Sequence, residues 1–329
     1  MPCIFRRDVE DAVPYRNVVF WEVFMKRFLA ILMVFALLTG CAPAPQAGTG
    51  CTFTDDLGRT VTVENPQRVA CLLGSFADIW HLAGGQVVAA PDDAWVDYRL
   101  PMADDAVDLG STKRLSLEAL FAAEPDLVLA SVNTEQNLQW RETLEAAKIP
   151  VAYFEVSDFG GYLRLLKKCT DLTGRPDLYE EYGLNVQKQI DEAVESAENR
   201  GTTPKVLYLR ISSSAVRAKN SKGTVLGQML ASLGCENLAD TDDSLLEQIS
   251  MEHILMEDPD FIFFVQQGDN TAAAEERLAQ FLADNPAWAT LTAVREGRVF
   301  HLDKALYNLK PNARWGEAYL ELEAILREN

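Results

Sequence analysis

Short apolar runs alternate with amphipathic stretches along most of this chain. In the first half, apolar runs of five or six residues bounded by polar residues predict buried strands, and stretches with a helical apolar period predict helices. Strands that alternate with helices favour a mostly parallel sheet with right-handed crossovers. We predict a hairpin at 53–63 with its turn at 56–58, strands at 69–73, 87–91, 126–130 and 151–156, and helices at 76–82, 116–123 and 138–148.

The same alternation returns after a long amphipathic stretch. Residues 176–199 keep a helical period, Pro176 opens the stretch and Gly201 follows it, as at the start and stop of a helix. Such a helix would extend about 36 Å. That length suits a rod joining two lobes, although an ordinary surface helix within one domain is the alternative. Beyond it we predict strands at 206–211, 261–266 and 299–302, and helices at 225–233, 250–257, 272–283 and 315–326.

One phrase occurs in both halves, 134 residues apart. Residues 116–131 read SLEALFAAEPDLVLAS and residues 250–265 read SMEHILMEDPDFIFFV. Each copy predicts a helix that a serine caps, that carries a glutamate in its first turn, and that a proline ends before a buried strand. Such junctions are common, so a chance match is the alternative, but the matched spacing favours two similar α/β lobes. The matched positions are Ser116 and Ser250, Glu118 and Glu252, Pro125 and Pro259, and Asp126 and Asp260.

The amino-terminal region has the pattern of an export signal. A basic start at 25–27 precedes an uncharged run at 28–38, and small residues lead to Cys41. Eleven apolar residues are too few to span a membrane, which takes about 20, so a secretory signal is favoured. The ending Leu-Thr-Gly-Cys resembles a bacterial lipoprotein box, which implies that Cys41 becomes lipidated. Residues 1–24 fit no export signal, and a start codon assigned upstream of Met25 explains them best.

Charge and cysteine content exclude several classes of protein. The chain has 30 basic and 49 acidic residues, and without residues 1–40 it has 25 and 45, a net charge of −20. Such an acidic chain is a poor nucleic-acid binder and lacks a polybasic membrane patch, so lipid would supply the anchoring. No CxxC pair occurs, which argues against a metal cluster. One disulfide can form among Cys51, Cys71, Cys169 and Cys235, and the sequence leaves its pairing open.

Sequence patterns of an enzyme or of a free-metal site are missing. HExxH, GxSxG and P-loop patterns do not occur, and LGSF at 73–76 lacks the glycines of a dinucleotide-binding turn. Two of the three histidines, His81 and His253, fall on predicted helices and His301 falls on a predicted strand, which disfavours a zinc or manganese site. We therefore expect no enzyme activity, no cofactor and no directly bound metal. A lipoprotein that senses a ligand without feeding a transporter is a further alternative.

Several stretches in a fixed order carry a resemblance to a known family. From about Cys51 to the end, the chain resembles the substrate-binding proteins of ABC importers, in the branch for iron siderophores, haem and cobalamin. The resemblance implies an α/β fold of two similar lobes with mostly parallel central sheets, joined by one long rigid helix, as in class III periplasmic binding proteins. The stretches are FTDDLGRTV at 53–61, PQRV at 66–69, LSLEAL at 115–120, EPDLV at 124–128, DPDFI at 258–262, NPAW at 285–288 and RVF at 298–300.

The resemblance also implies a function and its partners. The protein would be a monomer at the extracytoplasmic face of the cell membrane, anchored through lipidated Cys41. It would capture an iron complex, with a ferric siderophore favoured over haem or cobalamin, and deliver it to a permease and its ATPase. The implied organisation is an upstream extension at 1–24, a signal peptide at 25–40, a tether at 41–52, an N-terminal lobe at 53–173, a connecting helix at 174–201 and a C-terminal lobe at 202–329.

In that family, an acidic residue at the start of one helix in each lobe docks onto arginines of the permease. Glu118 and Glu252 occupy the matching places. Simple partners of the helix dipole are the alternative for these two carboxylates. A two-lobed protein that meets a two-fold permease needs one charged contact per half, which favours docking.

Ligands of open α/β sheets bind outside the carboxyl ends of the strands. The loops there are predicted at 74–76, 92–98, 110–114 and 131–136 in the first lobe and at 210–222, 266–270 and 304–315 in the second. The stretch 210–222 contains four basic residues and no acidic residue, which favours a bulky anion with flat faces as the ligand. A solvated basic surface is the alternative. The candidate ligand-binding residues are Phe76, Trp95, Tyr98, Lys113, Arg114, Arg210, Arg217, Lys219, Lys222, Lys310, Arg314 and Trp315.

Overall fold

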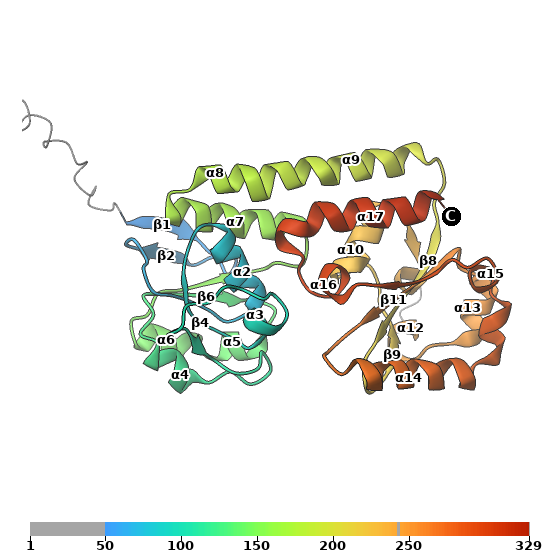
Figure 1. Ribbon diagram of the computed structural model, residues 1–329, viewed down its shortest axis with the longest axis horizontal. Helices are drawn as coiled ribbons and strands as arrows, with labels where there is room; N and C mark the ends of the chain where they lie inside the picture. Colours follow the sequence, from blue (N-terminus) through green and yellow to red (C-terminus); the bar gives the residue numbers. More distant parts are fainter. Residues whose placement is uncertain (1–49, 242–243, 329) are drawn as a thin grey trace, which may run out of the picture. The chain divides into compact units, whose positions relative to one another are not determined.

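Two five-stranded sheets form the centre of the molecule, and helices cover them (Figure 1). The computed structural model describes residues 50–241 and 244–328. The extension, the signal peptide, Cys41 and the tether up to residue 49 therefore lie outside the described residues. A small antiparallel hairpin of β1 (Cys51–Thr54) and β2 (Thr60–Val63) precedes the first sheet, as predicted.

The first sheet is entirely parallel, with the strand order β5-β4-β3-β6-β7. Alternate residues of each strand pack on opposite faces: Val69 and Cys71 of β3 join one apolar cluster, and Ala70 joins another. This two-sided burial explains the continuous apolar runs in the sequence. The strands are β3 (Val69–Cys71), β4 (Val87–Ala90), β5 (Val107–Asp108), β6 (Leu127–Ser131) and β7 (Val151–Phe154). The helices are α2 (Gly74–Leu82), α3 (Asp93–Val96), α4 (Leu117–Ala122), α5 (Glu135–Gln139), α6 (Arg141–Ala146) and α7 (Phe159–Thr173).

The second sheet has the order β10-β8-β11-β12, and β9 joins β8 as an antiparallel neighbour. Phe261, Phe263 and Val265 of β11 pack on one face and Ile262 and Phe264 on the other. The strands are β8 (Lys205–Ile211), β9 (Val216–Ala218), β10 (Glu236–Asn237), β11 (Phe261–Gln266) and β12 (Val299–Leu302). The helices are α10 (Val225–Ser232), α11 (Leu238–Thr241), α12 (Ser244–Glu247), α13 (Met251–Glu257), α14 (Thr271–Asp284), α15 (Thr292–Arg295), α16 (Lys304–Tyr307) and α17 (Trp315–Glu328), with 3₁₀ turns at Pro286–Thr290 and Asn312–Arg314.

The two sheets share one topology. In β4-β3-β6-β7 and in β10-β8-β11-β12, the first strand in the chain lies between the second and the third, and the fourth lies beside the third. The repeated phrase occupies the same place in both sheets, because α4 leads into β6 and α13 leads into β11. The predicted similarity of the two lobes is therefore confirmed.

The two copies of the phrase also agree in their local geometry. Ser116 Oγ accepts a hydrogen bond from the backbone N–H of Ala119 at 3.1 Å, and Ser250 Oγ accepts one from His253 at 3.3 Å. The residues before the two prolines, Glu124 and Asp258, both have a left-handed backbone, with φ of 47° and 42°. This conformation ends each helix, so the turn into the strand is built in the same way twice.

The aspartates of the phrase anchor each third strand to the first strand of its sheet. Asp126 accepts hydrogen bonds from the backbone N–H groups of Gln67 and Arg68, at 2.7 and 2.9 Å. Asp260 accepts one from the backbone N–H of Lys205 at 2.8 Å. These groups stand at the starts of β3 and β8, where no strand partner satisfies them, so the aspartate completes the edge of each sheet.

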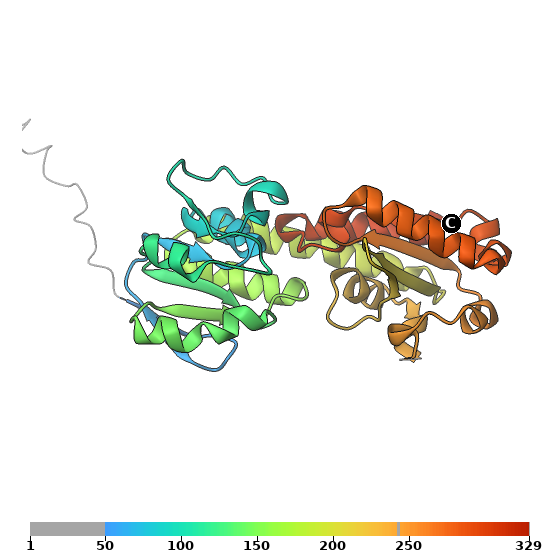
Figure 2. The same ribbon diagram turned by 90° about the horizontal axis from the view of Figure 1, so that it is seen from below.

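The predicted long helix is present, with a break in its regularity. It consists of α8 (Pro176–Tyr179), a π-helical turn (Glu180–Leu184) and α9 (Asn185–Asn199). Figures 1 and 2 show α9 running beside the C-terminal helix α17. A buried ion pair joins these two helices: Arg200 Nη1 lies 2.6 Å from Glu323 Oε2, and the side chains are 8% and 4% exposed. Ser196 of α9 also donates to Glu323, at 3.0 Å.

Several elements differ from the prediction. The largest is α7, which was not predicted although Asp158 caps it and Gly174 ends it with φ of 70°. Its sequence contains Gly160 and Gly161, which weaken the helical pattern. The predicted helix at 138–148 is two helices, α5 and α6, and it starts earlier. The short strands β5, β9 and β10 have no apolar run of their own and depend on their neighbours in the sheet.

Replacing Glu323 with alanine should lower the free energy of unfolding by about 3–5 kcal/mol, because the change leaves a buried Arg200 without its counter-charge. Urea denaturation followed by circular dichroism measures the loss. Glu195→Ala, at an exposed position of α9, is the matched control and should cost less than about 1 kcal/mol. Equal losses in the two variants would contradict a structural role for the buried pair.

Candidate functional site

A cavity of about 310 Å³ lies where loops from both sheets meet. The first sheet contributes the loops after β4 and β5, and the second contributes the loops after β11 and β12. All four loops follow the carboxyl ends of their strands, which is the expected place for a ligand. The lining residues are Asp92, Asp93, Val96, Asp97, Ser111, Thr112, Lys113, Gln267, Gly268, Asp269, Lys304, Asn308 and Leu309.

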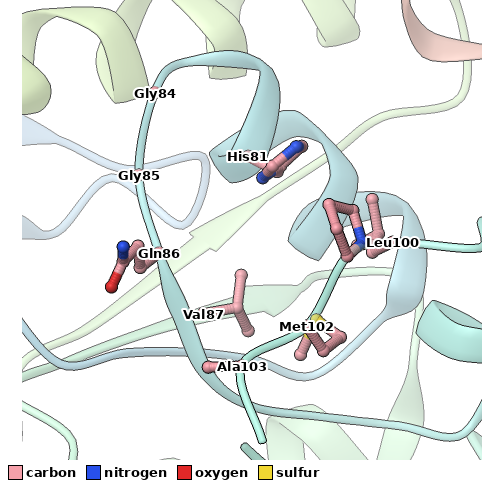
Figure 3. A pocket seen from close by; sticks show the side chains of 9 residues that line it. His81, Gly84, Gly85, Gln86, Val87, Leu100, Met102 and Ala103 are labelled. Atoms are coloured by element: carbon pink, nitrogen blue, oxygen red, sulfur yellow. The ribbon is translucent and has the colours of Figure 1, made fainter.

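A second cavity, of about 380 Å³, lies away from these loops. Figure 3 shows it between the end of α2, where His81 stands, the turn leading into β4, and the segment with Leu100 and Met102. Gln86 points to the other side of the chain from His81. The cavity borders the amino end of β4, the opposite end of that strand from the loop that reaches the first cavity. We therefore take the 310 Å³ cavity, together with the basic strand pair described next, as the candidate site.

A basic strand pair stands at the carboxyl edge of the second sheet. Arg210 of β8 and Arg217 of β9 are directly opposite each other in the antiparallel ladder. Lys219 follows two residues after Arg217, on the same side, and its backbone N–H donates to Tyr208 O at 2.9 Å. Arg210 Nη2 donates to the Tyr208 hydroxyl at 3.1 Å. Burial, with Arg210 and Arg217 nearby, lowers the pKa of Lys219.

Among the described residues, no carboxylate forms an ion pair with this cluster. Within residues 50–241 and 244–328, no ion pair joins Arg210, Arg217 or Lys219 to a carboxylate. Like charges directly opposite in a ladder destabilise it. Arg210 lies at the same edge as the cavity, because it is paired with Val265, next to the loop at Gln267. The arrangement is suited to holding an anion.

The remaining basic candidates are less clearly placed for a ligand. Lys113 is exposed and lines the cavity, and Arg114 and Lys222 are exposed. Arg314 is already occupied, since its guanidinium donates two hydrogen bonds of 2.6 Å to Glu317. Lys310 is half-buried.

The aromatic candidates are largely core residues. Phe76 and Trp315 are fully buried, and Trp315 packs edge-on against Phe159 with ring centroids 6.3 Å apart. The prediction that these two side chains face a ligand is wrong, because their apolar neighbours on α2, α7 and α17 cover them. Trp95 and Tyr98 are half-buried against the same core.

The acids of the cavity and Lys304 were not among the predicted ligand-binding residues. The predicted set favoured basic and aromatic residues, whereas the first-lobe wall carries Asp92, Asp93 and Asp97. That run of acids directly after a predicted strand was a readable pattern. Lys304 is the second residue after β12 and could have been found in the same way.

Burial raises the pKa of Asp93 to about 6. The backbone N–H of Gly74 donates to its carboxylate at 3.0 Å and opposes this shift, as does Lys310, whereas Asp97 and Asp92 add to it. Burial lowers the pKa of Lys310, and Asp93 counteracts that change. Asp93, which lines the cavity, and Lys310 thus influence each other's charge.

Neither a metal centre nor a disulfide appears among the described residues. No group of three or more His, Cys, Asp or Glu side chains in that part of the chain could hold a metal ion. Cys51, Cys71, Cys169 and Cys235 are all free thiols, and burial raises the pKa of Cys235 to about 12. No helix within residues 50–241 and 244–328 has the length and apolar character to cross a membrane.

The two glutamates of the repeated phrase lie away from the cavity lining. Glu118 and Glu252 stand in the first turns of α4 and α13, and both are exposed. Neither makes an ion pair with another described residue. Each is therefore available for contact with another molecule.

Two similar α/β halves with a cavity at their facing strand ends define a substrate-binding protein. The profile of the family described as "Periplasmic binding protein" matches residues 69–306. The chain belongs to this family, whose members carry substrates and are not enzymes. This confirms the expected relationship to the substrate-binding proteins of ABC importers.

Relatives and solved structures agree with this assignment. The chain is 23% identical over 304 residues to the Fe(3+)-citrate-binding protein YfmC of Bacillus subtilis (strain 168), covering 86% of this chain and 91% of the relative. It is 27% identical over 229 residues to a vitamin B12-binding protein of Pectobacterium atrosepticum, covering 68% and 80%. The haem-binding protein RhuT from Roseiflexus sp. RS-1 has the same fold, with a TM-score of 0.64, 21% identity and coverage of 80% and 98%.

Asp93 should make stability fall as the pH rises from about 4 to about 6. Its folded-state pKa lies above the ordinary 3.8, so in this window the folded protein holds a proton that the unfolded chain has lost. Asp93→Asn keeps an oxygen for Gly74 and removes the titration. Relative to this variant, the wild type should lose at most about 3 kcal/mol between pH 4 and pH 7. Denaturation at both pH values measures the difference, and exposed Asp92→Asn is the control. Parallel pH dependence in wild type and Asp93→Asn would contradict the prediction.

Proposed function

We propose that this protein is the extracytoplasmic substrate-binding component of an ABC importer and that it captures an anionic iron complex, with a ferric siderophore or ferric citrate favoured. The observation that carries the proposal is the basic strand pair of Arg210 and Arg217, with Lys219 beside it. In a chain of net charge −19, three neighbouring cations that form no ion pair with a described residue are a specific feature. Arginine pairs bind carboxylate and catecholate oxygens through several N–H donors at once.

The cavity lining supports a polar ligand over a flat apolar one. Val96 and Leu309 are its only large apolar residues, and charged and amide side chains make up most of the rest. A tetrapyrrole buries its faces against apolar and aromatic walls, whereas the aromatic residues among the ligand-binding candidates are buried or half-buried in the core. Haem or cobalamin, which related proteins bind by name, is therefore the second choice.

Delivery would use the exposed glutamates of the repeated phrase. Glu118 and Glu252 stand at equivalent places on two equivalent helices. A permease built from two like halves presents the same surface twice, so one carboxylate on each lobe meets one basic site on each half. We further propose that lipid on Cys41 holds the protein, as a monomer, at the outer face of the membrane. Cys41 lies outside the described residues.

Tryptophan-fluorescence titration of the full chain against ferric citrate, ferric siderophores, haem and cobalamin tests the ligand class. We expect saturation by an anionic iron complex. Arg210→Gln with Arg217→Gln should weaken that binding by ten-fold or more, since each charged hydrogen bond contributes roughly 1.5–3 kcal/mol. The charge-matched control is Lys188→Gln with Arg277→Gln, both at exposed positions of helices. Binding of haem alone, or an equal loss in the control, would refute the anionic iron complex.

Charge reversal of both docking glutamates should abolish uptake and leave ligand affinity unchanged. Glu118→Lys with Glu252→Lys places two cations against the basic sites of the permease, which costs several kcal/mol of docking energy. Uptake of the radiolabelled iron complex by cells and titration of the purified variant measure the two effects separately. Glu135→Lys with Glu275→Lys is the matched control on exposed helical positions. A loss of ligand affinity in the Glu118→Lys, Glu252→Lys variant would contradict a docking role for these glutamates.

A further inference from the structure

Among the described residues, one ion pair joins the two lobes at the solvent-exposed side of the 310 Å³ cavity, which we call its mouth. Lys304, the first residue of α16 in the second lobe, places Nζ 2.9 Å from Oδ1 of Asp97, which follows α3 in the first lobe. The same nitrogen lies 2.6 Å from Oδ1 of Asp269. Asp269 belongs to the second lobe, so only the bond with Asp97 joins the two walls. All three residues line the 310 Å³ cavity.

Besides apolar packing, two further polar contacts join the lobes at more buried positions. The Tyr98 hydroxyl donates to Lys310 O at 3.3 Å. Below it, Asn312 Nδ2 donates to Ser75 O at 2.9 Å and to Asp78 at 2.7 Å. Asn312 is fully buried. The second-lobe residues of these three contacts, or ties, are Lys304, Lys310 and Asn312. They follow one another from the exposed mouth of the cavity to a buried side, which we call the floor.

The ties differ in how easily they can break. If Asn312 moved away from α2, Ser75 O and the carboxylate of Asp78 would lose a hydrogen-bond donor. This loss is costly for buried groups, so the contact at the floor is hard to break. The side chains of Lys304 and Asp97 are each 21% exposed, and that of Asp269 is 78% exposed. Water can replace either partner at the mouth, so an ion pair there is only weakly stabilising. The mouth can therefore open while the floor stays joined.

We propose that the Asp97–Lys304 ion pair is a latch that holds the mouth of the empty site together, and that an anionic group of the ligand takes Lys304 over from Asp97. The second part rests on the proposed function. Lys304 is suited to this exchange because it stays charged: burial lowers its pKa, but hydrogen bonds with Asp269 and Asp97 outweigh burial and raise it. The exchange swaps one anionic partner of Lys304 for another, and it leaves the carboxylate of Asp97, which is 21% exposed, to be hydrated by water.

The first-lobe wall explains why the latch needs a lysine. Asp92, Asp93 and Asp97 lie together on that wall, and Asp269 faces them from the second lobe. Without Lys304 these acids would repel each other and also an anionic ligand. The two halves of the ion pair therefore have opposite effects on an anion. Asp97 competes with it, and Lys304 attracts it.

Amide hydrogen exchange of the ligand-free full chain tests the latch itself. Asp97→Asn and Lys304→Met should speed exchange at residues 91–98 and 303–309 by roughly two- to five-fold, the range of a partly exposed ion pair. Asp269→Asn is the matched control, since it removes a partner of Lys304 without touching the bond between the lobes, and it should leave exchange at 91–98 unchanged. Unchanged exchange in Asp97→Asn and Lys304→Met, or the same rise in the control, would overturn the latch.

Titration with ferric citrate and an anionic ferric siderophore tests the exchange of partners. Asp97→Asn should bind the anionic complex roughly two- to five-fold more tightly, and Lys304→Met should bind it more weakly by a similar factor. A purely structural ion pair would shift both variants in the same direction, and that result would overturn the exchange. If the wild type binds no anionic complex, the exchange and the proposed function both fail, whereas hydrogen exchange still decides the latch.

Discussion

One apolar cluster that continues from the first sheet into the second is the constraint on which the rest of the structure depends. It contains Val69 and Leu127 from one sheet, Tyr208 and Phe263 from the other, and residues of α7, α9 and α17 between them. Separating the lobes would expose this cluster to water, at a cost that grows with the apolar area uncovered. The buried pair of Arg200 and Glu323 fixes α9 against α17 within the same region. The joint between the lobes therefore rests on apolar burial that both sheets share.

The strand ends that face each other carry opposite charges in the two lobes. The first-lobe wall carries a row of aspartates, and the second-lobe edge carries Arg210, Arg217 and Lys219. The arginines stand side by side without a carboxylate from the described residues, which costs stability in the empty protein. A bound anion would remove that cost, so affinity for a ligand and instability of the empty site have the same origin. Lys304 lies between the two parts and contacts acids of both lobes.

Much of the fold could be predicted from local pattern. The bounds of β11 and β12 were predicted to the residue and α10 to within one residue, because continuous apolar runs and helical periods are local properties. Helix α7 was missed, since two glycines near its start weaken the pattern that its cap at Asp158 and its end at Gly174 support. Phe76 and Trp315 were misjudged for another reason. They are the last residues of two predicted binding loops, but their burial depends on helices that are distant in sequence.

The sequence by itself determined the two α/β lobes, their duplicated helix–strand phrase and the long helix between them, because each follows from the order of polar and apolar residues along a short segment. It also marked the basic segment at 210–222. Only the tertiary structure decided that Arg210 and Arg217 are opposite each other, that Phe76 and Trp315 belong to the core, and that Lys304 reaches Asp97. Lys304 and Asp97 are 207 positions apart in the sequence. Contacts at that separation arise when the packed core brings two loops together, and no local pattern encodes them.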